Sequence, residues 1–564
     1  MKVKDIEYKR IDVYEIEKTY IKTAEKINEA KSVEEVIIAR EECVKQTVLL
    51  DTYYNLAFIR WSLDTKNEFY LNEKSYYEEN IPLINKAKTK YIKSIINSKF
   101  FDKIEKLLPN SLLKIYKNEL ISSSPIISDD LVLEAGLEDE YSNFLSGLLI
   151  DFNGEKIPLT ILKKYMANED RNVRKSAYEC FGLELEKHAD FIDGNFDNLV
   201  KVRTKMAQKL GYDSFTDLGY VRMNRVCYNK SDVERLRNNI IKYVVPKISK
   251  IRKKVSKKLG IKTLMLYDYD AVFKDAEPKP KGGVDLLNDS GKKLYGNMSK
   301  DTAIFYDFML NNGAFDCESK PNKWGGGYQT DLALFNQPFI LANFNGTSAD
   351  ADVLTHETGH AYASYVMAKN NKDKELSLPF MDVAETHSMS MEFLCWKNIE
   401  LIFGDDAKRY KFKHLLDSFT FLSYGALIDA FQHEVYDNYQ LSCKDRNDLF
   451  NALEGVYRPY LSSKGIKYFE KGTRWQYQMH VFENPFYYID YVLAQITSLN
   501  LLLISLTDYD KAFSLYNDFL SLGADYGYLQ ALEKVGLPSP LDESNLKNVA
   551  DKVYKLLVKM LKRL

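Results

Sequence analysis

Histidine is rare in this sequence, with only seven residues among 564. Two of them, His356 and His360, enclose Glu357 in an H-E-x-x-H motif. Four helical residues at ~100° each return to nearly the same azimuth, so both imidazoles would lie on one helix face. Imidazole nitrogens are common zinc ligands, and the glutamate between them is offset toward a zinc-bound water. The motif therefore predicts a zinc site with His356 and His360 as ligands and Glu357 as general base.

The alternative interpretation of the motif is a pair of ordinary histidines on a helix surface. Because histidine is so rare, a chance H-E-x-x-H is expected in roughly one sequence per hundred of this composition. The motif also contains Gly359, which lowers helix stability by ~0.8–1.0 kcal/mol relative to alanine. A bare backbone at this position would be explained by the close approach of another segment.

A catalytic zinc needs a third protein ligand as well as an open position. The segment FMDVAETHSMSMEFLCW, residues 380–396, offers four candidates, Asp382, Glu385, His387 and Glu392. Glu385 and Glu392 lie two helical turns apart and share one face. One of them could bind the metal while the other accepts the free N–H of a ligand histidine. The spacing alone leaves all four candidates open.

The elements around the motif can also be predicted. The helix is expected to begin at Thr347 or Ser348, whose hydroxyls could cap it, with Asp350 and Asp352 in its first turn. The preceding residues, 328–345, read YQTDLALFNQPFILANFN and predict two short strands joined by a turn. An exposed edge of this small sheet could bind an extended peptide as one more strand. Alternatively, the hairpin only packs against the helices.

The rest of the chain is predicted to be mostly α-helical. Glycine and proline together number 40 of 564 residues, roughly 7% against an average of about 12%, which favours long helices. Apolar residues recur at three- and four-residue steps from residue 13 to about 211, with breaks at 109–110, 122–125 and 153–154 that we expect to connect helices. The length predicts two domains, an N-terminal helical domain at 1–190 and a catalytic domain at 191–564.

Composition and charge exclude several classes of protein. The formal net charge of −2 makes nucleic acid an unexpected partner. The six cysteines form no C-x-x-C pair, so neither a disulfide framework nor a thiolate metal site is predicted. The N-terminal residues lack the apolar stretch of a secretory signal, and no apolar stretch approaches the ~20 residues that span a bilayer. We expect a cytoplasmic protein without a membrane partner.

Several motifs together resemble a known family. HETGHA is followed 29 residues later by Glu385 in VAETHSMSMEF, and RWQYQMHVFENPFYYIDYVLAQ occupies residues 474–495. Similar motifs are YKRIDV, FTDLGYVRMNR, WGGGYQT and FILANFNGT. The sequence resembles the M3 family of zinc metallopeptidases, the thimet oligopeptidase relatives, and most closely the oligoendopeptidase F branch. The resemblance covers essentially the whole chain. It departs at Gln329, where relatives carry a small or cysteine-like residue, so no role is transferred to that side chain.

The resemblance implies roles for further residues. Glu385 would be the third ligand of one Zn²⁺ per chain, and Glu392 would lie behind the ligands. His480 and the tyrosines of residues 487–491 would face the substrate, where imidazole and phenol donors could stabilise the negative charge of the tetrahedral intermediate. Tyr488 and Tyr491 are the main candidates, with Tyr487 a third. Without the resemblance, a run of tyrosines more simply indicates aromatic packing.

The resemblance also implies fold and activity. The expected fold is a two-part helical metallopeptidase with a small β-sheet beside the H-E-x-x-H helix and an enclosed substrate channel. The expected activity is zinc-dependent hydrolysis of internal bonds in short unstructured oligopeptides, with the zinc-bound water activated by Glu357. The alternatives are a zinc carboxypeptidase, which must recognise a terminal carboxylate, and an inactive homologue that only binds peptides. The sequence does not indicate an oligomeric state.

Overall fold

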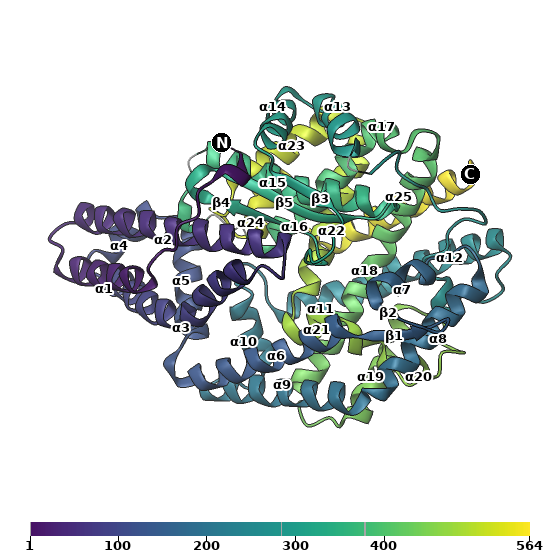
Figure 1. Ribbon diagram of the computed structural model, residues 1–564, viewed down its shortest axis with the longest axis horizontal. Helices are drawn as coiled ribbons and strands as arrows, with labels where there is room; N and C mark the ends of the chain where they lie inside the picture. Colours follow the sequence, from purple (N-terminus) through teal and green to yellow (C-terminus); the bar gives the residue numbers. More distant parts are fainter. Residues whose placement is uncertain (1, 284, 371, 377–379) are drawn as a thin grey trace. The chain divides into compact units, whose positions relative to one another are not determined.

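A computed structural model describes residues 2–283, 285–370, 372–376 and 380–564 of the chain. Its secondary structure is mostly α-helical, with five short strands among the described residues (Figure 1). The predicted mostly-α fold with a small sheet beside the motif helix is therefore confirmed. The enclosed channel stays a prediction.

The contacts divide the chain into two compact units, each built from three segments. The first unit comprises residues 1–123, 278–410 and 497–538, and the second comprises residues 124–277, 411–496 and 539–564. The predicted division into domains 1–190 and 191–564 stays a prediction.

Five helices of the first unit come from the N-terminal segment. They are α1 (Val13–Glu29), α2 (Val33–Leu63), α3 (Glu68–Ile96), α4 (Phe101–Leu107) and α5 (Asn110–Ser122). Side chains of Asp12, Ser32 and Asn67 accept backbone N–H groups at the starts of α1, α2 and α3, which fixes where these helices begin. Their apolar faces share one buried core, to which Leu376 and Ala524 also contribute.

A three-stranded sheet of the first unit precedes the motif helix. Its strands are β3 (Phe315–Glu318), β4 (Tyr328–Leu332) and β5 (Gln337–Phe344), in the order β3-β5-β4. β4 and β5 are antiparallel, with Gln329 opposite Ile340, as the predicted hairpin requires. β3 pairs with β5 in parallel and was not predicted, because its four residues, FDCE, carry little strand signal.

The motif lies on α15 (Ser348–Lys369), which packs against β4, β5 and α16 (Met381–Leu394) (Figure 1). α15 begins at Ser348, as expected, but the expected hydroxyl cap from Thr347 is not formed. The Thr347 hydroxyl donates to Asn345 Oδ1 at 2.7 Å and makes no capping bond to the helix. Instead, the Asp350 carboxylate in the first turn accepts the backbone N–H groups of Asn345 and Gly346 at 2.7–3.1 Å. This aspartate ties the end of β5 to the start of the helix.

Further helices complete the first unit. They are α13 (Lys292–Gly296), α14 (Lys300–Asn311), α17 (Glu400–Phe403), α23 (Tyr509–Leu522) and α24 (Tyr528–Val535). Two long helices, α18 (Ala407–Asp437) and α22 (Tyr488–Ser505), have residues in both units. α22 is the one described helix that is long and apolar enough to cross a membrane, and 72% of its window is buried, as in the core helix of a globular protein.

The second unit contains a β-hairpin where the sequence predicted a connection between helices. β1 (Leu149–Phe152) and β2 (Glu155–Pro158) are antiparallel and joined by Asn153-Gly154. Both turn residues have positive φ, 54° and 85°, which an Asn-Gly pair adopts readily in a two-residue hairpin turn. The expectation of a helix-to-helix connection at 153–154 was wrong, although Asn-Gly is a recognised hairpin signal.

The remaining elements of the second unit are helices. They are α6 (Ser128–Gly147), α7 (Leu159–Met166), α8 (Arg171–Lys187), α9 (Ala189–Lys209), α10 (Phe215–Arg222), α11 (Lys230–Asn239), α12 (Val245–Leu259), α19 (Cys443–Tyr457), α20 (Lys467–Glu470), α21 (Met479–Glu483) and α25 (Glu543–Leu561).

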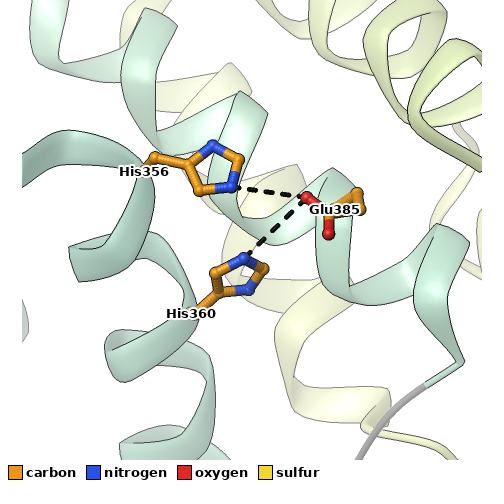
Figure 2. Close-up of side chains that lie close together, drawn as sticks. All are labelled: His356, His360 and Glu385. Carbon is orange, nitrogen blue, oxygen red and sulfur yellow. Dashed lines mark ion pairs between the residues drawn. The ribbon is translucent and has the colours of Figure 1, made fainter. Parts of the chain in front are cut away.

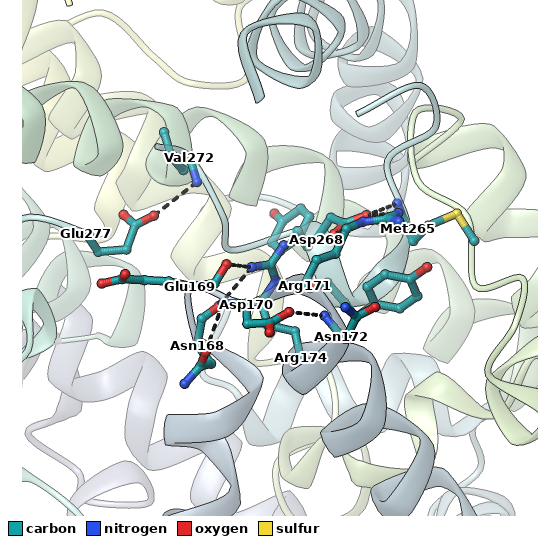
Figure 3. A network of polar contacts seen from close by, with 12 residues as sticks. Asn168, Glu169, Asp170, Arg171, Asn172, Arg174, Met265, Asp268, Val272 and Glu277 are labelled. Atoms are coloured by element: carbon teal, nitrogen blue, oxygen red, sulfur yellow. Dashed lines mark hydrogen bonds and ion pairs between the residues drawn. The ribbon is translucent and has the colours of Figure 1, made fainter. Parts of the chain in front are cut away.

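A buried carboxylate fixes the loop that follows α12 in this unit. Asp268 is fully buried and accepts hydrogen bonds from Arg171 at 2.8–2.9 Å and from Arg174 at 3.0 Å (Figure 3). Arg174 also donates to the carbonyl of Tyr267 at 2.9 Å. Bidentate guanidinium–carboxylate pairs are among the strongest side-chain hydrogen bonds, so the loop is held firmly to the start of α8.

Candidate active site

The two histidines of the motif meet a carboxylate from the neighbouring helix. The rings of His356 and His360 lie 5.0 Å apart on one face of α15. One Glu385 oxygen, on α16, lies 3.4 Å from His356 Nε2 and 3.9 Å from His360 Nε2 (Figure 2). One donor atom from each of the three residues lies within 4.8 Å of the others. Of the four candidates for a third ligand, the structure therefore brings Glu385 to the histidines.

The close contact between α15 and α16 depends on Gly359. A Cβ atom at this position would lie 2.6 Å from the Cα of Ser388 and 2.9 Å from the carbonyl oxygen of His387. Real Cβ atoms do not come so close to backbone, so any other residue would push the two helices apart. The glycine within the motif therefore explains how Glu385 approaches the histidines.

The orientation of His356 is fixed from behind by Glu392. His356 Nδ1 donates a hydrogen bond to Glu392 Oε1 at 2.7 Å. This bond leaves Nε2 on the side of Glu385 and His360. A carboxylate that accepts the second N–H of a ligand histidine sets its tautomer and increases its basicity. The spacing alone left the roles of Glu385 and Glu392 open, and the resemblance implied Glu385 as the ligand. In the structure Glu385 lies near both Nε2 atoms, whereas Glu392 contacts Nδ1 of His356.

Burial shifts the pKa values of the site in different directions. Burial lowers the pKa of His360 to about 4, which keeps that imidazole neutral. Burial also acts to lower the pKa of His356, but its hydrogen bonds with Glu385 and Glu392 outweigh this and hold the pKa well above the usual value. Burial raises the pKa of Glu357 to about 7, although the charge of His356 acts in the opposite direction. A carboxyl group with this pKa is suited to exchanging protons near neutral pH.

The three grouped side chains fit a zinc ion. Two imidazole nitrogens and one carboxylate oxygen are the donor set of many catalytic zinc sites, which bind at ~2.0–2.2 Å. Tetrahedral geometry at such bond lengths places donor atoms roughly 3.3 Å apart. The distances of 3.4 Å and 3.9 Å from the Glu385 oxygen to the two Nε2 atoms are close to this separation.

The two other candidates for the third ligand are not in this group. Asp382 lies at the start of α16, and its side-chain Oδ1 accepts a hydrogen bond from the backbone N–H of Val383 at 2.8 Å. His387 is buried against the ring of Phe519, with centroids 5.5 Å apart. Among the described residues, neither joins His356, His360 and Glu385.

The second predicted cluster lies in the second unit. The His480 ring lies 4.9 Å from the ring of Tyr488 and 5.9 Å from that of Tyr491, and Tyr487 is 5.7 Å away. The Gln478 amide lies 3.1 Å from His480 Nδ1, and Tyr424 donates to the same glutamine at 2.7 Å. The predicted residues thus form one imidazole–phenol cluster. Their role toward a scissile carbonyl stays a prediction.

Comparisons with known proteins identify the family. The family "Peptidase family M3" matches residues 300–550, and the "Peptidase M3 N-terminal domain" matches residues 3–122. The solved structure of PZ peptidase A with an inhibitor is similar over 99% of both chains, with 33% identity and a TM-score of 0.93. The chain belongs to peptidase family M3. It is a metalloendopeptidase of that family.

Two curated relatives of this M3 peptidase are oligoendopeptidases. The oligoendopeptidase F homologue of Mycoplasma genitalium is 23% identical over 439 residues, which cover 70% of this chain and 68% of the relative. The chromosomal oligoendopeptidase F of Lactococcus lactis subsp. cremoris is 25% identical over 403 residues, which cover 68% and 63% of the two chains. The M3 resemblance inferred from the motifs is confirmed.

Sequence reasoning missed two contacts in this M3 peptidase. The backbone N–H of Gln329 in β4 bonds to the Glu357 carboxylate and acts to lower its pKa. No role was transferred to the side chain at this position, and the backbone contact does not depend on side-chain identity. Gln478 was not singled out either, although it stands two residues before His480 and carries both a donor and an acceptor.

Proposed function

We propose that this M3 peptidase is a zinc-dependent oligoendopeptidase that hydrolyses internal peptide bonds of short unstructured oligopeptides. The observation that supports it most directly is the convergence of His356, His360 and Glu385 beside Glu357. These three side chains would hold one zinc ion per chain. When bound, zinc polarises a peptide carbonyl and lowers the pKa of a water molecule.

The protein's own residues would then move the protons. Glu357 accepts a proton from the attacking water and delivers it to the leaving amine, as its pKa of about 7 allows. Glu392 holds His356 in the required orientation through the hydrogen bond to Nδ1. His480, Tyr488 and Tyr491 donate hydrogen bonds to the oxygen that becomes negative in the tetrahedral intermediate.

An extended peptide would bind along β4, which is an edge strand of the sheet. Main-chain hydrogen bonds of such a strand hold peptides of many sequences. The Asp331 carbonyl already accepts a hydrogen bond from the Asn55 side chain at 2.9 Å. Asn55 would therefore limit pairing to the part of β4 nearer Gln329, where the Gln329 N–H is itself bonded to the Glu357 carboxylate.

The test is product mapping with a short peptide blocked at both ends, incubated with the zinc-loaded protein. We expect internal cuts, because the proposal requires neither a free amine nor a free carboxylate. The same peptide with a free C-terminus is the matched substrate. Cleavage of this second peptide alone, one or two residues from its end, would instead indicate the carboxypeptidase. Tight binding of both peptides without any cleavage would indicate the inactive homologue.

A further inference from the structure

A basic groove lies beside the C-terminal half of α12 in the second unit. The groove has a cavity volume of about 1010 Å³. Of the residues that the structure describes, no acidic one lines it, and its lining includes five lysines, Lys250, Lys253, Lys254, Lys257 and Lys262, together with Arg252. Its volume matches the upper end of small-molecule sites, ~300–1,000 Å³. In a protein of net charge −2, this concentration of positive charge is local.

The sequence of α12 creates this charge. The helix reads VPKISKIRKKVSKKL, in which seven of fifteen residues are basic and none is acidic. Lys250, Lys253, Lys254 and Lys257 stand at positions i, i+3, i+4 and i+7, so they share one helix face. Like charges at these spacings repel one another and destabilise a helix.

Contacts within the fold do not neutralise this face. Lys247 pairs with Asp551 at 3.1 Å, and Lys258 donates to the carbonyl of Leu561 at 2.6 Å. Among the described residues, the five lysines of the groove form no ion pair with a carboxylate. The helix C-terminus favours positive charge only within its last turn. This explains Lys257 but not the lysines at 250, 253 and 254.

The floor of the groove is fixed and partly aromatic. Arg252 is 1% exposed and donates to the Tyr269 carbonyl at 2.8 Å and to Thr420 at 3.1 Å. Tyr460 and Tyr554 also line the groove. The wall at residues 262–264 continues into the loop that Asp268 holds to α8 (Figure 3). The groove is therefore a shaped surface and not a mobile lysine-rich tail.

We propose that this groove binds a small ligand that carries two or more phosphate groups, such as a nucleoside triphosphate. Successive turns of the helix place these lysines ~5.4 Å apart, so a ligand with a single charged group would contact only some of them. Lysine is a common phosphate ligand that acts as a point charge. The tyrosines give a nucleotide base an aromatic surface on which to stack. None of the residues that line the groove belongs to the proposed catalytic set.

The test is calorimetric titration of the full-length, zinc-loaded protein with magnesium-saturated ATP and, separately, with inorganic triphosphate. We expect saturable binding that weakens as salt is raised, because screening reduces the attraction. Tighter binding of ATP would assign a contact to the base, and equal binding would assign recognition to the phosphates alone. Both outcomes support the proposal. Excess magnesium limits chelation of the zinc by the phosphates.

Paired charge-reversal variants localise the binding. Lys253→Glu/Lys257→Glu should weaken the affinity at least tenfold, whereas Lys86→Glu/Lys90→Glu, on exposed positions of α3, makes the same change in net charge and should leave it unaltered. If the first pair fails to fold, Lys253→Gln/Lys257→Gln provides a milder test. Equal affinity in both pairs, absence of binding, or binding of RNA but of neither small ligand would overturn the proposal.

Discussion

Glu357 is the residue on which the proposed proton transfers depend. Its side chain is half-buried, and its pKa of about 7 results mainly from burial. The sequence could identify this residue, because its place between two histidines of one helical turn follows from helix geometry alone. The pKa could not be predicted, since it depends on how tightly α16 and β4 cover the helix.

Replacing Glu357 with glutamine should nearly abolish hydrolysis, with kcat reduced on the order of 10²–10⁴-fold or more, because the amide cannot accept the proton. Zinc should remain bound, since the ligands are intact. Steady-state kinetics and metal analysis check the two expectations. Glu318→Gln, on an exposed position of β3, is the control and should retain activity. Normal kcat in Glu357→Gln would remove it as the general base.

Asp331 in β4 is predicted to make stability depend on pH. Burial raises its pKa to about 6, even though hydrogen bonds from Ser364 and Gln329 act to lower it. Between pH ~4, the ordinary value for aspartate, and pH 6 the folded state binds more protons than the unfolded state. Stability contributed by the neutral acid is therefore present at low pH and is lost as the pH rises through 6.

Asp331→Asn removes this titration. Between pH 4 and 7 the unfolding free energy of the variant should therefore decrease less than that of the wild type, by on the order of 2 kcal/mol after a discount for the partial exposure of the side chain. Denaturant unfolding at several pH values measures the difference from wild type. Asp139→Asn, on an exposed position of α6, serves as the control and should keep the wild-type slope. An unchanged slope in Asp331→Asn would contradict the assignment.

At the scale of elements, the pair α15 and α16 positions the proposed ligands. The sequence predicts the motif helix from the four-residue spacing of His356 and His360, and a second helix from the seven-residue spacing of Glu385 and Glu392. Their separation does not follow, since it is set by one missing side chain at Gly359. The sequence suggested a close approach at this glycine, and the structure identifies the approaching residues as His387 and Ser388.

Gly359→Ala should therefore destabilise the protein by ~1–3 kcal/mol and weaken metal binding, because overpacking moves α16 away from α15. Gly136→Ala is the matched control. Gly136 lies inside α6 with nothing within 4 Å of the added Cβ, so alanine there should stabilise by ~0.5–1 kcal/mol. Thermal unfolding and zinc affinity check both variants. A neutral effect of Gly359→Ala would show that the helices are not in tight contact.

Only two of the five short strands could be predicted from the sequence. β4 and β5 were predicted from apolar and aromatic runs around a proline turn. β3 contains too few strand-forming residues, and its pairing with β5 is non-local. β1 and β2 are joined by the Asn-Gly turn signal, but β2 reads EKIP and begins with two exposed charged residues, so a second strand was not predicted. The strands that were not predicted, β1, β2 and β3, depend on tertiary pairing more than on local propensity.

At the scale of the whole molecule, long-range ion pairs join distant parts of the chain within one unit. Arg40 on α2 is 5% exposed and bonds to Asp373 at 2.7 Å and to Glu375 at 2.6 Å. Tyr116 donates to the same glutamate at 2.5 Å. No sequence pattern indicates such pairs, because their members are separated by more than 330 residues.

Arg40→Met should destabilise the protein by ~3–5 kcal/mol, because it leaves buried carboxylates without their partner. Arg40→Met/Glu375→Gln should recover part of this loss, since one uncompensated charge is removed with the arginine. Denaturant unfolding of the single and double variants measures the coupling. If both variants are as stable as wild type, the N-terminal helices do not depend on this ion pair.

The central claim is that His356, His360 and Glu385 hold one zinc ion that peptide hydrolysis requires. The most direct measurement is the zinc content of purified wild-type protein and of Glu385→Gln, determined together with peptide hydrolysis before and after chelation. We predict about one zinc per chain in the wild type, a much lower content in Glu385→Gln, and loss of hydrolysis on chelation that added zinc restores. Full zinc content in Glu385→Gln, or hydrolysis that persists in metal-free protein, would contradict the claim.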